Sequence, residues 1–547
     1  MATARHGSEL RGISHVDRSS IANGRFGRLF YGYDPPQHSE EALEALAKTM
    51  IQGEFEKKRQ EHEQEGCPLD ELKLDHPLNE LEEEDENITI PAGYTYLGQF
   101  IDHDITFDPV SSLQAFNDPY ALEDFRTPRL DLDSIYGRGP DDQPYLYVWA
   151  SPTRTSKRLK FLLGHDRSPQ TPSQKRPDLP RNQEQVALIG DPRNDENRIV
   201  SQLHALFLQF HNRVVDELCR QKSSMEDKDI FAQAQQIVRW HYQWIVLRDY
   251  LPKIVGESMA EEVLNLKEPA FPRLRFFRPK SGQAYMPVEF SVAAFRFGHS
   301  MVRPSYALSH TTQQGIDTRF HRIPIFSYFF PGEEGKFEGL SASEKQRLNL
   351  DGLQLLPDGW GVDWAFFFGD ASAFDSEHHG PKFPQPSYRI DTKIVDPLAQ
   401  LPRFTDFSSL AHRNLLRGWR LQLPSGESVS EAIKKAIPAT KILDRDELWD
   451  GRAELRKEFE NGAPLWFYIL REAELEKHKE HKDDELGGHH LGPVGGRIVA
   501  EVLVGLAYYD RKSYLQQYPD WTPEPWIAPQ PKTFSMADLV HFVDGPA

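Results

Sequence analysis

Cysteine is almost absent from this chain. Only Cys67 and Cys219 occur among its 547 residues, so at most one disulfide could form. Small secreted domains that depend on disulfides carry several spaced cysteines, and that class is excluded. Residues 1–7 also lack the apolar core of a signal peptide. We therefore expect a cytoplasmic protein, or one that is exported without a cleaved signal peptide.

Long apolar runs and an excess of positive charge are missing as well. No segment approaches the roughly 20 apolar residues that cross a bilayer, and the best candidate, residues 498–509, is short and contains Glu501. The formal net charge is -19, whereas nucleic acids and anionic membranes attract clustered lysine and arginine. The sequence therefore predicts neither a membrane span nor a nucleic-acid partner.

The residues that are present predict a helical fold with a large core. Hydrophobic residues make up 39% of the chain, which is enough for a large buried interior. The clearest pattern lies in residues 201–218, where Leu203, Leu206, Phe207 and Phe210 recur at steps of three and four. Sustained strand alternation is rare. We therefore expect a mainly α fold.

One histidine stands between two carboxylates. Residues 97–104 place His103 directly between Asp102 and Asp104, and Gln99 precedes the histidine by one helical turn. A neutral imidazole can both accept and donate a proton near neutral pH. Taken alone, such a histidine is more often structural, so its significance depends on the other motifs.

Two further motifs supply complementary chemistry. Residues 190–196 contain Arg193, a permanent positive charge that can stabilise developing negative charge, although the segment could also be a plain helix start. Residues 294–299 end at His299, which is suited to axial ligation of haem iron. A haem that cleaves peroxide needs a proton shuttle, a charge stabiliser and an axial ligand on opposite faces, and these motifs offer one of each.

In this order the motifs resemble the animal-type haem peroxidases of the peroxidase–cyclooxygenase superfamily. The resemblance extends through residues 206–213, 414–417, 464–466 and 492–497. It covers most of the chain from about residue 91 onward, and it implies a mainly α haem peroxidase domain with haem b as its cofactor.

The resemblance implies a distal set of residues. His103 would move a proton between the two peroxide oxygens, Arg193 would stabilise the developing charge, and Gln99 would position peroxide, water or a halide. Asp102 and Glu196 match two acidic positions that become ester-linked to haem in mammalian members. Ordinary salt bridges are the simpler alternative for both carboxylates.

It also implies a proximal set. His299 matches the iron ligand, and Asn414 matches the acceptor that bonds its other ring nitrogen and raises ligand basicity. Arg296 and Arg417 would lie near the haem propionates or on the proximal face. Each arginine could equally form a structural ion pair.

A calcium site is expected near the distal histidine. Residues 127–133 place oxygen-bearing groups at every second position, so an extended loop could turn them toward one hard cation. The resemblance makes the ligands Asp104, Thr127, the Arg129 carbonyl, Asp131 and Asp133. Asp133 stands where the family usually has serine, which adds a carboxylate. A simple turn is the alternative.

Domain organisation follows from where these residues lie. Residues 1–90 are predicted to form an N-terminal arm and a charged helical region, with a charged helix over residues 54–65 and a solvated acidic run over residues 80–86. The candidate site residues are scattered over the rest of the chain, and a cut between them would divide one site. We therefore predict a single domain over residues 91–547.

His204 and His211 lie two turns apart on the predicted helix. No companion ligands with zinc-site spacing occur nearby. We expect both to be packed structural histidines rather than metal ligands.

The implied reaction is the reduction of hydrogen peroxide coupled to oxidation of small donors, through a ferryl intermediate. Bromide, iodide, thiocyanate and phenols are the expected donors. Asn197 stands where one mammalian member has a methionine that forms a third covalent link to haem. That link is impossible here, so chloride oxidation is not expected.

Two alternatives remain. A cyclooxygenase-like fatty-acid oxygenase would use the same scaffold, but cyclooxygenases carry a radical-forming tyrosine three residues before the proximal histidine, where this chain has Arg296. Tyr306 remains open as an unrelated radical site. A non-catalytic haem-binding fold is the other alternative, and it has no need for the combination of Gln99, His103 and Arg193.

Overall fold

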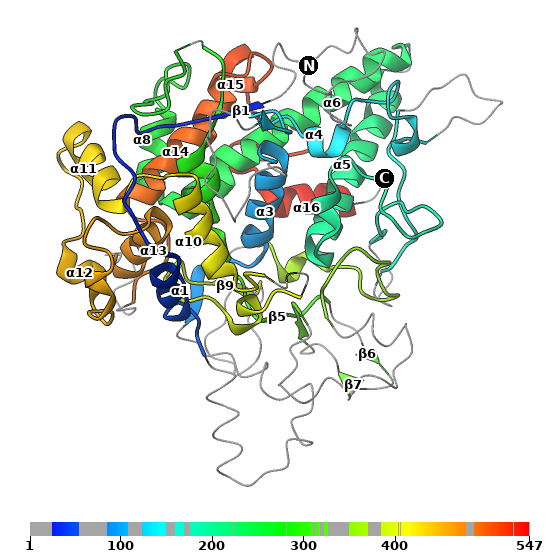
Figure 1. Cartoon of the computed structure of the whole chain (residues 1–547). Helices are drawn as coiled ribbons and strands as arrows, with labels where there is room; N and C mark the ends of the chain where they lie inside the picture. Colours follow the sequence, from blue (N-terminus) through cyan, green and yellow to red (C-terminus); the bar gives the residue numbers. More distant parts are fainter. Residues whose placement is uncertain are drawn as a thin grey trace, which may run out of the picture.

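The computed structural model describes most of the chain and is mainly helical (Figure 1). The described residues are 24–53, 85–107, 123–148, 159–168, 175–222, 224–280, 282–309, 312–313, 316–317, 322–326, 349–369, 384–402, 404, 406–476, 486–528 and 530–545. The predicted fold class is confirmed. Within these ranges, no helix has both the length and the apolar character needed to cross a bilayer.

The helices are α1 (Glu40–Lys48), α3 (Gly93–Ile105), α4 (Asp133–Tyr136), α5 (Arg198–Gln221), α6 (Asp227–Trp244), α7 (Leu251–Val255), α8 (Glu257–Leu264), α10 (Leu410–Arg420), α11 (Gly426–Ala436), α12 (Arg445–Trp449), α13 (Leu465–Leu475), α14 (Pro493–Tyr508), α15 (Tyr514–Gln517) and α16 (Met536–Asp544). Shorter 3₁₀ or π turns near the site are η5 (Pro192–Asp195), η6 (Ile245–Tyr250), η7 (Glu289–Ala293) and η8 (Ala294–His299).

The strands are short and pair locally. They are β1 (Gly24–Gly27), β2 (Glu86–Pro91), β3 (Glu123–Asp124), β4 (Met286–Pro287), β5 (Ser305–Tyr306), β6 (Thr312–Gln313), β7 (Ile316–Asp317), β8 (Ile323–Pro324) and β9 (Pro386–Tyr388). Among the described strands, β1 lies between β3 and β4, and the others form two-stranded pairs: β2 with β9, β5 with β8 and β6 with β7. The helices therefore build the core.

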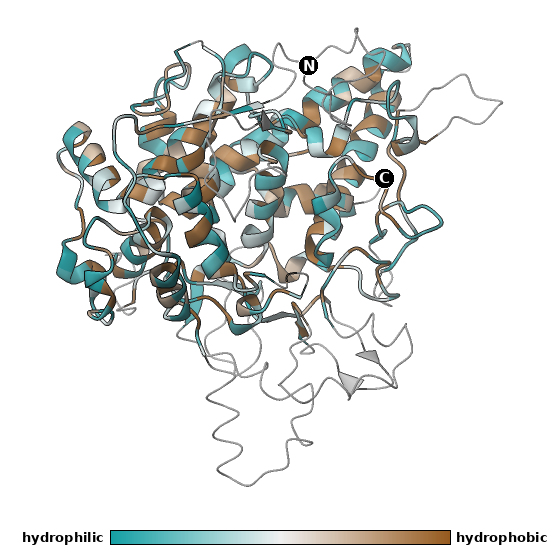
Figure 2. Cartoon of the chain, viewed as in Figure 1, coloured by the Kyte–Doolittle hydropathy of each residue, from teal (hydrophilic) through white to brown (hydrophobic). Residues whose placement is uncertain are grey.

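Helix α5 is a buried element of that core. It includes residues 201–218, for which the apolar spacing predicts a helix. Asn197 caps it by accepting a hydrogen bond from a backbone N–H in the first turn. Helices α3 and α6 pack against it, and Phe100 of α3 stacks on Phe207 of α5 with ring centroids 4.9 Å apart. Figure 2 shows hydrophobic residues gathered on the inner faces of the helices.

Glycine lets α3 pass close to η6. A Cβ atom at Gly98 would lie 2.6 Å from the hydroxyl oxygen of Tyr250, which is closer than real Cβ contacts allow. Gly98 belongs to the motif that carries the candidate distal histidine. The glycine therefore brings this motif against the helical core.

The described N-terminal residues pack into the same core as the later elements. β1 pairs with β3 antiparallel and with β4 in parallel, and α1 packs on α10. Glu289 accepts hydrogen bonds from the backbone N–H groups of Leu29 (3.0 Å) and Phe30 (3.2 Å). The expected helix over residues 54–65 lies outside the described residues, and the division of the chain near residue 90 stays a prediction.

The end of the acidic run differs from the expectation of a solvated surface. Asp85 and Glu86 are only 4% and 6% exposed. Glu86 pairs with the buried Arg303 at 2.9 Å, and Asp85 pairs with Lys393 at 2.8 Å. The prediction was wrong for these two residues because their opposite charges come from segments far away in the sequence.

The contact of Glu289 with the N-terminal segment gives a first prediction. Replacing Glu289 with alanine leaves two buried N–H groups without an acceptor, which should lower the free energy of unfolding by about 1–3 kcal/mol. Trypsin should then cut at Arg28 faster, as seen in a proteolysis time course, because the segment opens more often. Glu289→Gln is the matched control, since its amide oxygen still accepts, and it should lose less. Equal cleavage rates in all three proteins would contradict this role.

Candidate functional site

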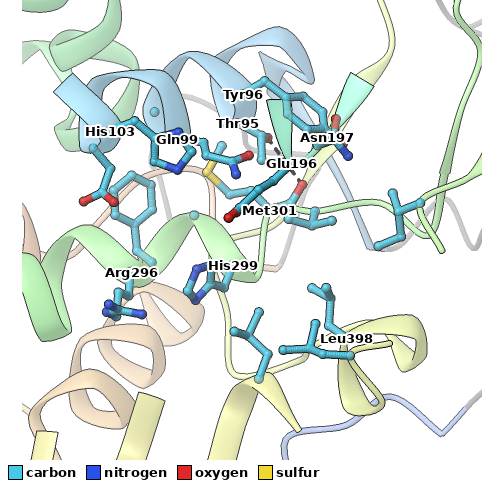
Figure 3. A pocket seen from close by; sticks show the side chains of 18 of the residues that line it. Thr95, Tyr96, Gln99, His103, Glu196, Asn197, Arg296, His299, Met301 and Leu398 are labelled. Atoms are coloured by element: carbon cyan, nitrogen blue, oxygen red, sulfur yellow. Dashed lines mark hydrogen bonds between the residues drawn. The ribbon is translucent and has the colours of Figure 1, made fainter. Parts of the chain in front are cut away.

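A cavity of about 360 Å³ brings the predicted motifs together (Figure 3). His103 and Gln99 lie on α3 on one side, and His299 and Arg296 lie on η8 on the other side. Its other lining residues are Tyr94, Thr95, Tyr96, Gly98, Asp102, Glu196, Asn197, Tyr250, Phe295, Phe297, Gly298, Met301, Val302, Ile325, Phe326, Asp351, Leu398, Leu401, Pro402, Phe404 and Leu410. Two imidazoles therefore face a largely apolar space from opposite walls.

His103 is held by an asparagine from η5. Its Nδ1 lies 2.8 Å from Oδ1 of Asn194. An amide oxygen can only accept, so Nδ1 donates and the lone pair lies on Nε2. Burial, assisted by the positive charge of Arg193, lowers the pKa of His103 to about 3. The imidazole is therefore neutral at neutral pH, with a basic nitrogen available to the cavity.

Arg193 lies next to His103 but is not among the residues that line the cavity. Its Nη2 donates to the His103 carbonyl at 2.9 Å and to Asp191 at 2.8 Å, and its guanidinium covers the ring of Phe107 at 4.4 Å. Burial alone would raise the pKa of Asp191, but Arg193 and then Arg126 outweigh it and hold that pKa below its usual value. Asp191 thus balances part of the charge of Arg193, whose distal role stays a prediction.

The two carboxylates that match the ester-forming positions both line the cavity. Asp102 comes from α3, and Glu196 follows η5. Burial raises the pKa of Asp102, although the charges of Arg193 and Arg296 oppose this effect. The structure places both carboxylates on the wall of one ligand-sized space.

On the opposite wall, His299 is bonded to Asn414 of α10. The Asn414 Nδ2 lies 2.7 Å from His299 Nδ1, while Asn414 Oδ1 accepts from Arg296 Nη1 at 3.0 Å. Arg296 Nε also donates to the Ser291 carbonyl at 3.1 Å. The pairing of Asn414 with His299 is present, but Asn414 is the donor rather than the expected acceptor. The reason is that Arg296 occupies the amide oxygen.

This polarity decides the tautomer of His299. Because Nδ1 accepts, the ring proton lies on Nε2, and burial followed by the charge of Arg296 lowers the pKa of His299 to about 3. Turning the Asn414 amide by 180° would put its oxygen on Nδ1 and give Nε2 the lone pair that iron ligation requires. Arg417 lies one turn beyond Asn414 and is not among the cavity residues.

Three carboxylates gather at the predicted cation loop. Oxygens of Asp104, Asp131 and Asp133 lie within 4.8 Å of one another. Burial, and then the neighbouring carboxylates, raise the pKa of Asp104 well above its usual value. The Thr127 hydroxyl is buried without a hydrogen-bond partner, and Arg129 lies in the same loop. Crowded carboxylates and an unpaired hydroxyl fit a hard dication such as calcium.

Some contacts of the site could not be found from the sequence. Asn194 lies inside a quoted motif, but nothing in the local pattern shows that its amide reaches His103. Met301, Ile325 and Leu398 line the cavity from irregular segments, and apolar residues in such segments carry no signal. Trp466, in a segment that the resemblance covers, donates from Nε1 to the Arg296 carbonyl at 3.1 Å.

Comparison with known proteins identifies the class. Residues 119–342 match the family model described as Animal haem peroxidase. The chain is 29% identical to peroxinectin A of Dictyostelium discoideum over 173 residues, which is 30% of this chain and 29% of that protein. It is 27% identical to thyroid peroxidase of Rattus norvegicus over 206 residues, which is 37% of this chain and 22% of that protein. The matches span less than a third of these relatives.

Solved structures agree on the fold. Peroxidase A from Dictyostelium discoideum aligns with a TM-score of 0.54 and 15% identity, over 96% of this chain and 94% of that chain. Oryza sativa fatty acid alpha-dioxygenase aligns with a TM-score of 0.50 and 14% identity, over 85% and 73%. This chain therefore shares its fold with both of these solved structures. The family match shows in addition that the chain carries a domain of the animal haem peroxidase family, as the motifs predicted.

The buried histidines predict how stability depends on pH. Burial lowers the pKa of His103, His204 and His299 to about 3, and that of His211 and His241 to about 4. In the unfolded chain a histidine becomes protonated below about pH 6.5, whereas these buried histidines stay neutral in the folded protein down to lower pH. The free energy of unfolding should therefore fall as pH drops below about 6.5 and continue to fall toward pH 4.

One histidine can be isolated in this experiment. In His241→Leu, the slope of unfolding free energy against pH between 5 and 6 should decrease by up to about 1.4 kcal/mol per pH unit, the value for one proton. Denaturant unfolding at each pH measures it. The exposed His165 supplies the control variant His165→Gln, which should keep the wild-type slope. An unchanged slope in His241→Leu would show that this histidine takes up no extra proton on unfolding.

Proposed function

We propose that this chain is a haem peroxidase that reduces hydrogen peroxide while oxidising small donors: bromide, iodide, thiocyanate or phenols. The observation that carries the proposal is the placement of His103 and His299 on opposite walls of one largely apolar cavity. Haem b bound there would supply a redox-active iron. The volume of about 360 Å³ lies in the range of cofactor and ligand sites.

The chain's own residues would hold the haem from two sides. His299 is the iron ligand in this proposal, with the Asn414 amide turned so that its oxygen accepts from Nδ1. Asp102 and Glu196 are the carboxylates available for ester bonds to the macrocycle. Arg296 and Arg417 would lie near the haem propionates or on the proximal face.

His103 would move the proton. Its Nε2 would take a proton from one peroxide oxygen and return it to the other, which would leave as water. Gln99 orients the peroxide, and the positive charge of Arg193 behind the histidine favours charge separation. Each peroxide accepts two electrons and two protons and yields two waters. The electrons come from one two-electron donor or two one-electron donors.

A fatty-acid dioxygenase of the same fold is the second candidate. The observation in its favour is that Tyr94, Tyr96 and Tyr250 line the cavity, since a tyrosine can carry a radical. Arg296, three residues before the candidate iron ligand, stands against it. The two functions differ in the oxygen they consume, because only a dioxygenase takes up molecular oxygen with a fatty acid.

Two variants test the peroxidase proposal after haem reconstitution. In His103→Ala the Soret band should persist, but the rate of its change with hydrogen peroxide should fall about 10²–10⁴-fold, the usual contribution of a general acid–base group. In His299→Ala the band should weaken and shift because the axial ligand is lost. Stopped-flow absorbance measures both, with guaiacol and bromide added separately to follow recovery.

Three results of these measurements would contradict the peroxidase proposal. A wild-type rate in His103→Ala would remove the proton-transfer role. A Soret band indifferent to peroxide in the wild type would favour the non-catalytic fold. Oxygen uptake with palmitic acid, without donor oxidation, would favour the dioxygenase.

We also propose that the carboxylate cluster binds calcium. The five ligands are the carboxylates of Asp104, Asp131 and Asp133, the Thr127 hydroxyl and the Arg129 carbonyl. Asp104 directly follows His103, so the ion would tie the catalytic segment of α3 to the loop at α4. A divalent charge also offsets the mutual repulsion of three carboxylates.

Calcium should therefore stabilise the protein. At a concentration 100 times its Kd, it should raise the free energy of unfolding by about 2.7 kcal/mol over the protein in EDTA. Calorimetric melting of the haem-free protein measures this. Asp104→Asn should abolish the effect and Asp133→Ser should weaken it, whereas Asp141→Asn, at an exposed carboxylate outside the cluster, should retain it. Equal melting temperatures with calcium and with EDTA would exclude the site.

A further inference from the structure

His204 connects to the cavity through a chain of two hydrogen bonds. Its Nδ1 lies 3.0 Å from Nδ2 of Asn194, and Oδ1 of the same amide lies 2.8 Å from Nδ1 of His103. The three side chains come from α5, η5 and α3. His204 and Asn194 are fully buried and His103 is 5% exposed, so water does not compete strongly for these bonds.

The direction of the chain follows from the orientation of the Asn194 amide, with Nδ2 toward His204 and Oδ1 toward His103. Nδ2 of Asn194 can only donate, so Nδ1 of His204 must carry a lone pair and its proton must lie on Nε2. With Nδ2 committed to His204, Oδ1 faces His103 and accepts from its Nδ1. The opposite orientation of the amide would present a donor to His103, move that ring's proton to Nε2, and remove the lone pair from the cavity.

His204 itself is poorly satisfied. Its Nε2 is buried and has no hydrogen-bond partner, although Phe100 packs edge-on against its ring at 6.3 Å. A buried polar atom without a partner is unfavourable and calls for an explanation. An apolar residue would avoid this cost if the position only filled space. The contact that needs a histidine here is the one to Asn194.

We propose that Asn194 and His204 are positioning residues that keep His103 in the tautomer with its proton on Nδ1 and its lone pair on Nε2. Only this tautomer can take the proton from peroxide, so the inference rests on the proposed peroxidase function for its catalytic consequence. The arrangement of the ring proton itself does not depend on haem or peroxide, and can be measured separately.

The first measurement uses the haem-free protein. Selective ¹⁵N labelling of histidine, with His103→Gln to assign the signals, reports which ring nitrogen of His103 carries the proton. Wild type should show the proton on Nδ1. Asn194→Leu, which keeps the side-chain size and removes the amide, should show loss of this preference, and so should His204→Leu. An unchanged His103 tautomer in both variants would overturn the proposal.

The second measurement follows peroxide in the haem-reconstituted protein. Asn194→Leu and His204→Leu should slow the peroxide-driven Soret change about 10-fold or more, with haem content close to wild type. His211→Phe is the matched control, because His211 is equally buried on α5 and bonds to Tyr136 and the Leu159 carbonyl instead. Its rate should remain that of the wild type.

A conservative variant gives a signature that a purely structural role would not produce. Asn194→Asp keeps an acceptor on Nδ1 of His103, so both the proton on Nδ1 and the wild-type rate should be retained, whereas Asn194→Leu, of similar size, should lose both.

The outcomes separate this inference from the proposed function. Wild-type peroxide rates in both leucine variants, or loss of the Nδ1 proton of His103 in Asn194→Asp, would overturn the positioning role and leave the peroxidase proposal standing. A wild type that ignores peroxide, but whose His103 tautomer still changes in Asn194→Leu, would remove the function and keep the positioning role.

Discussion

Two asparagine–histidine hydrogen bonds control the chemistry that the cavity can support. Asn194 accepts from Nδ1 of His103 at 2.8 Å, and Asn414 donates to Nδ1 of His299 at 2.7 Å. Both imidazoles are neutral because burial opposes a second proton, so each ring has one protonated and one basic nitrogen. The partner of Nδ1 therefore determines what Nε2 offers. The distal ring already offers a lone pair, whereas the proximal ring offers a proton until the Asn414 amide turns.

Charged side chains contact both of these asparagine–histidine pairs or the backbone beside them. Arg296 holds the oxygen of Asn414, and so controls the polarity of the proximal bond. Arg193 is paired with Asp191 and bonded to the backbone of His103, which keeps its charge close to the ring without placing it on the cavity wall. Asp104, which directly follows His103 on α3, belongs to the carboxylate cluster. The segment of α3 that carries His103 is thus held by the contact of Arg193 with its backbone and by the contacts of Asp104, and the proposed cation would strengthen the second.

Much of this arrangement could be predicted where the signal is local. The apolar repeat that identifies α5 depends only on helical spacing, and the helix contains the predicted residues. The sequence motifs identify His103, Gln99 and His299, and the structure brings them to one cavity. Asp104, Asp131 and Asp133 also meet as expected. The roles of all these residues remain predictions, since residues that meet in space need not perform the expected chemistry.

Other features depend on partners that are distant in the sequence. The end of the acidic run is buried because Arg303 and Lys393 reach it. The direction of the Asn414 bond depends on Arg296, and Asn194 acquires its role only when His204 of α5 faces it. Spacing and residue type are local properties, and they are sufficient to predict the helical class, the family and several of the polar residues of the cavity. Hydrogen-bond direction, ring tautomer and the neutralisation of charges depend on which side chains pack together after folding, so they follow from the tertiary structure alone.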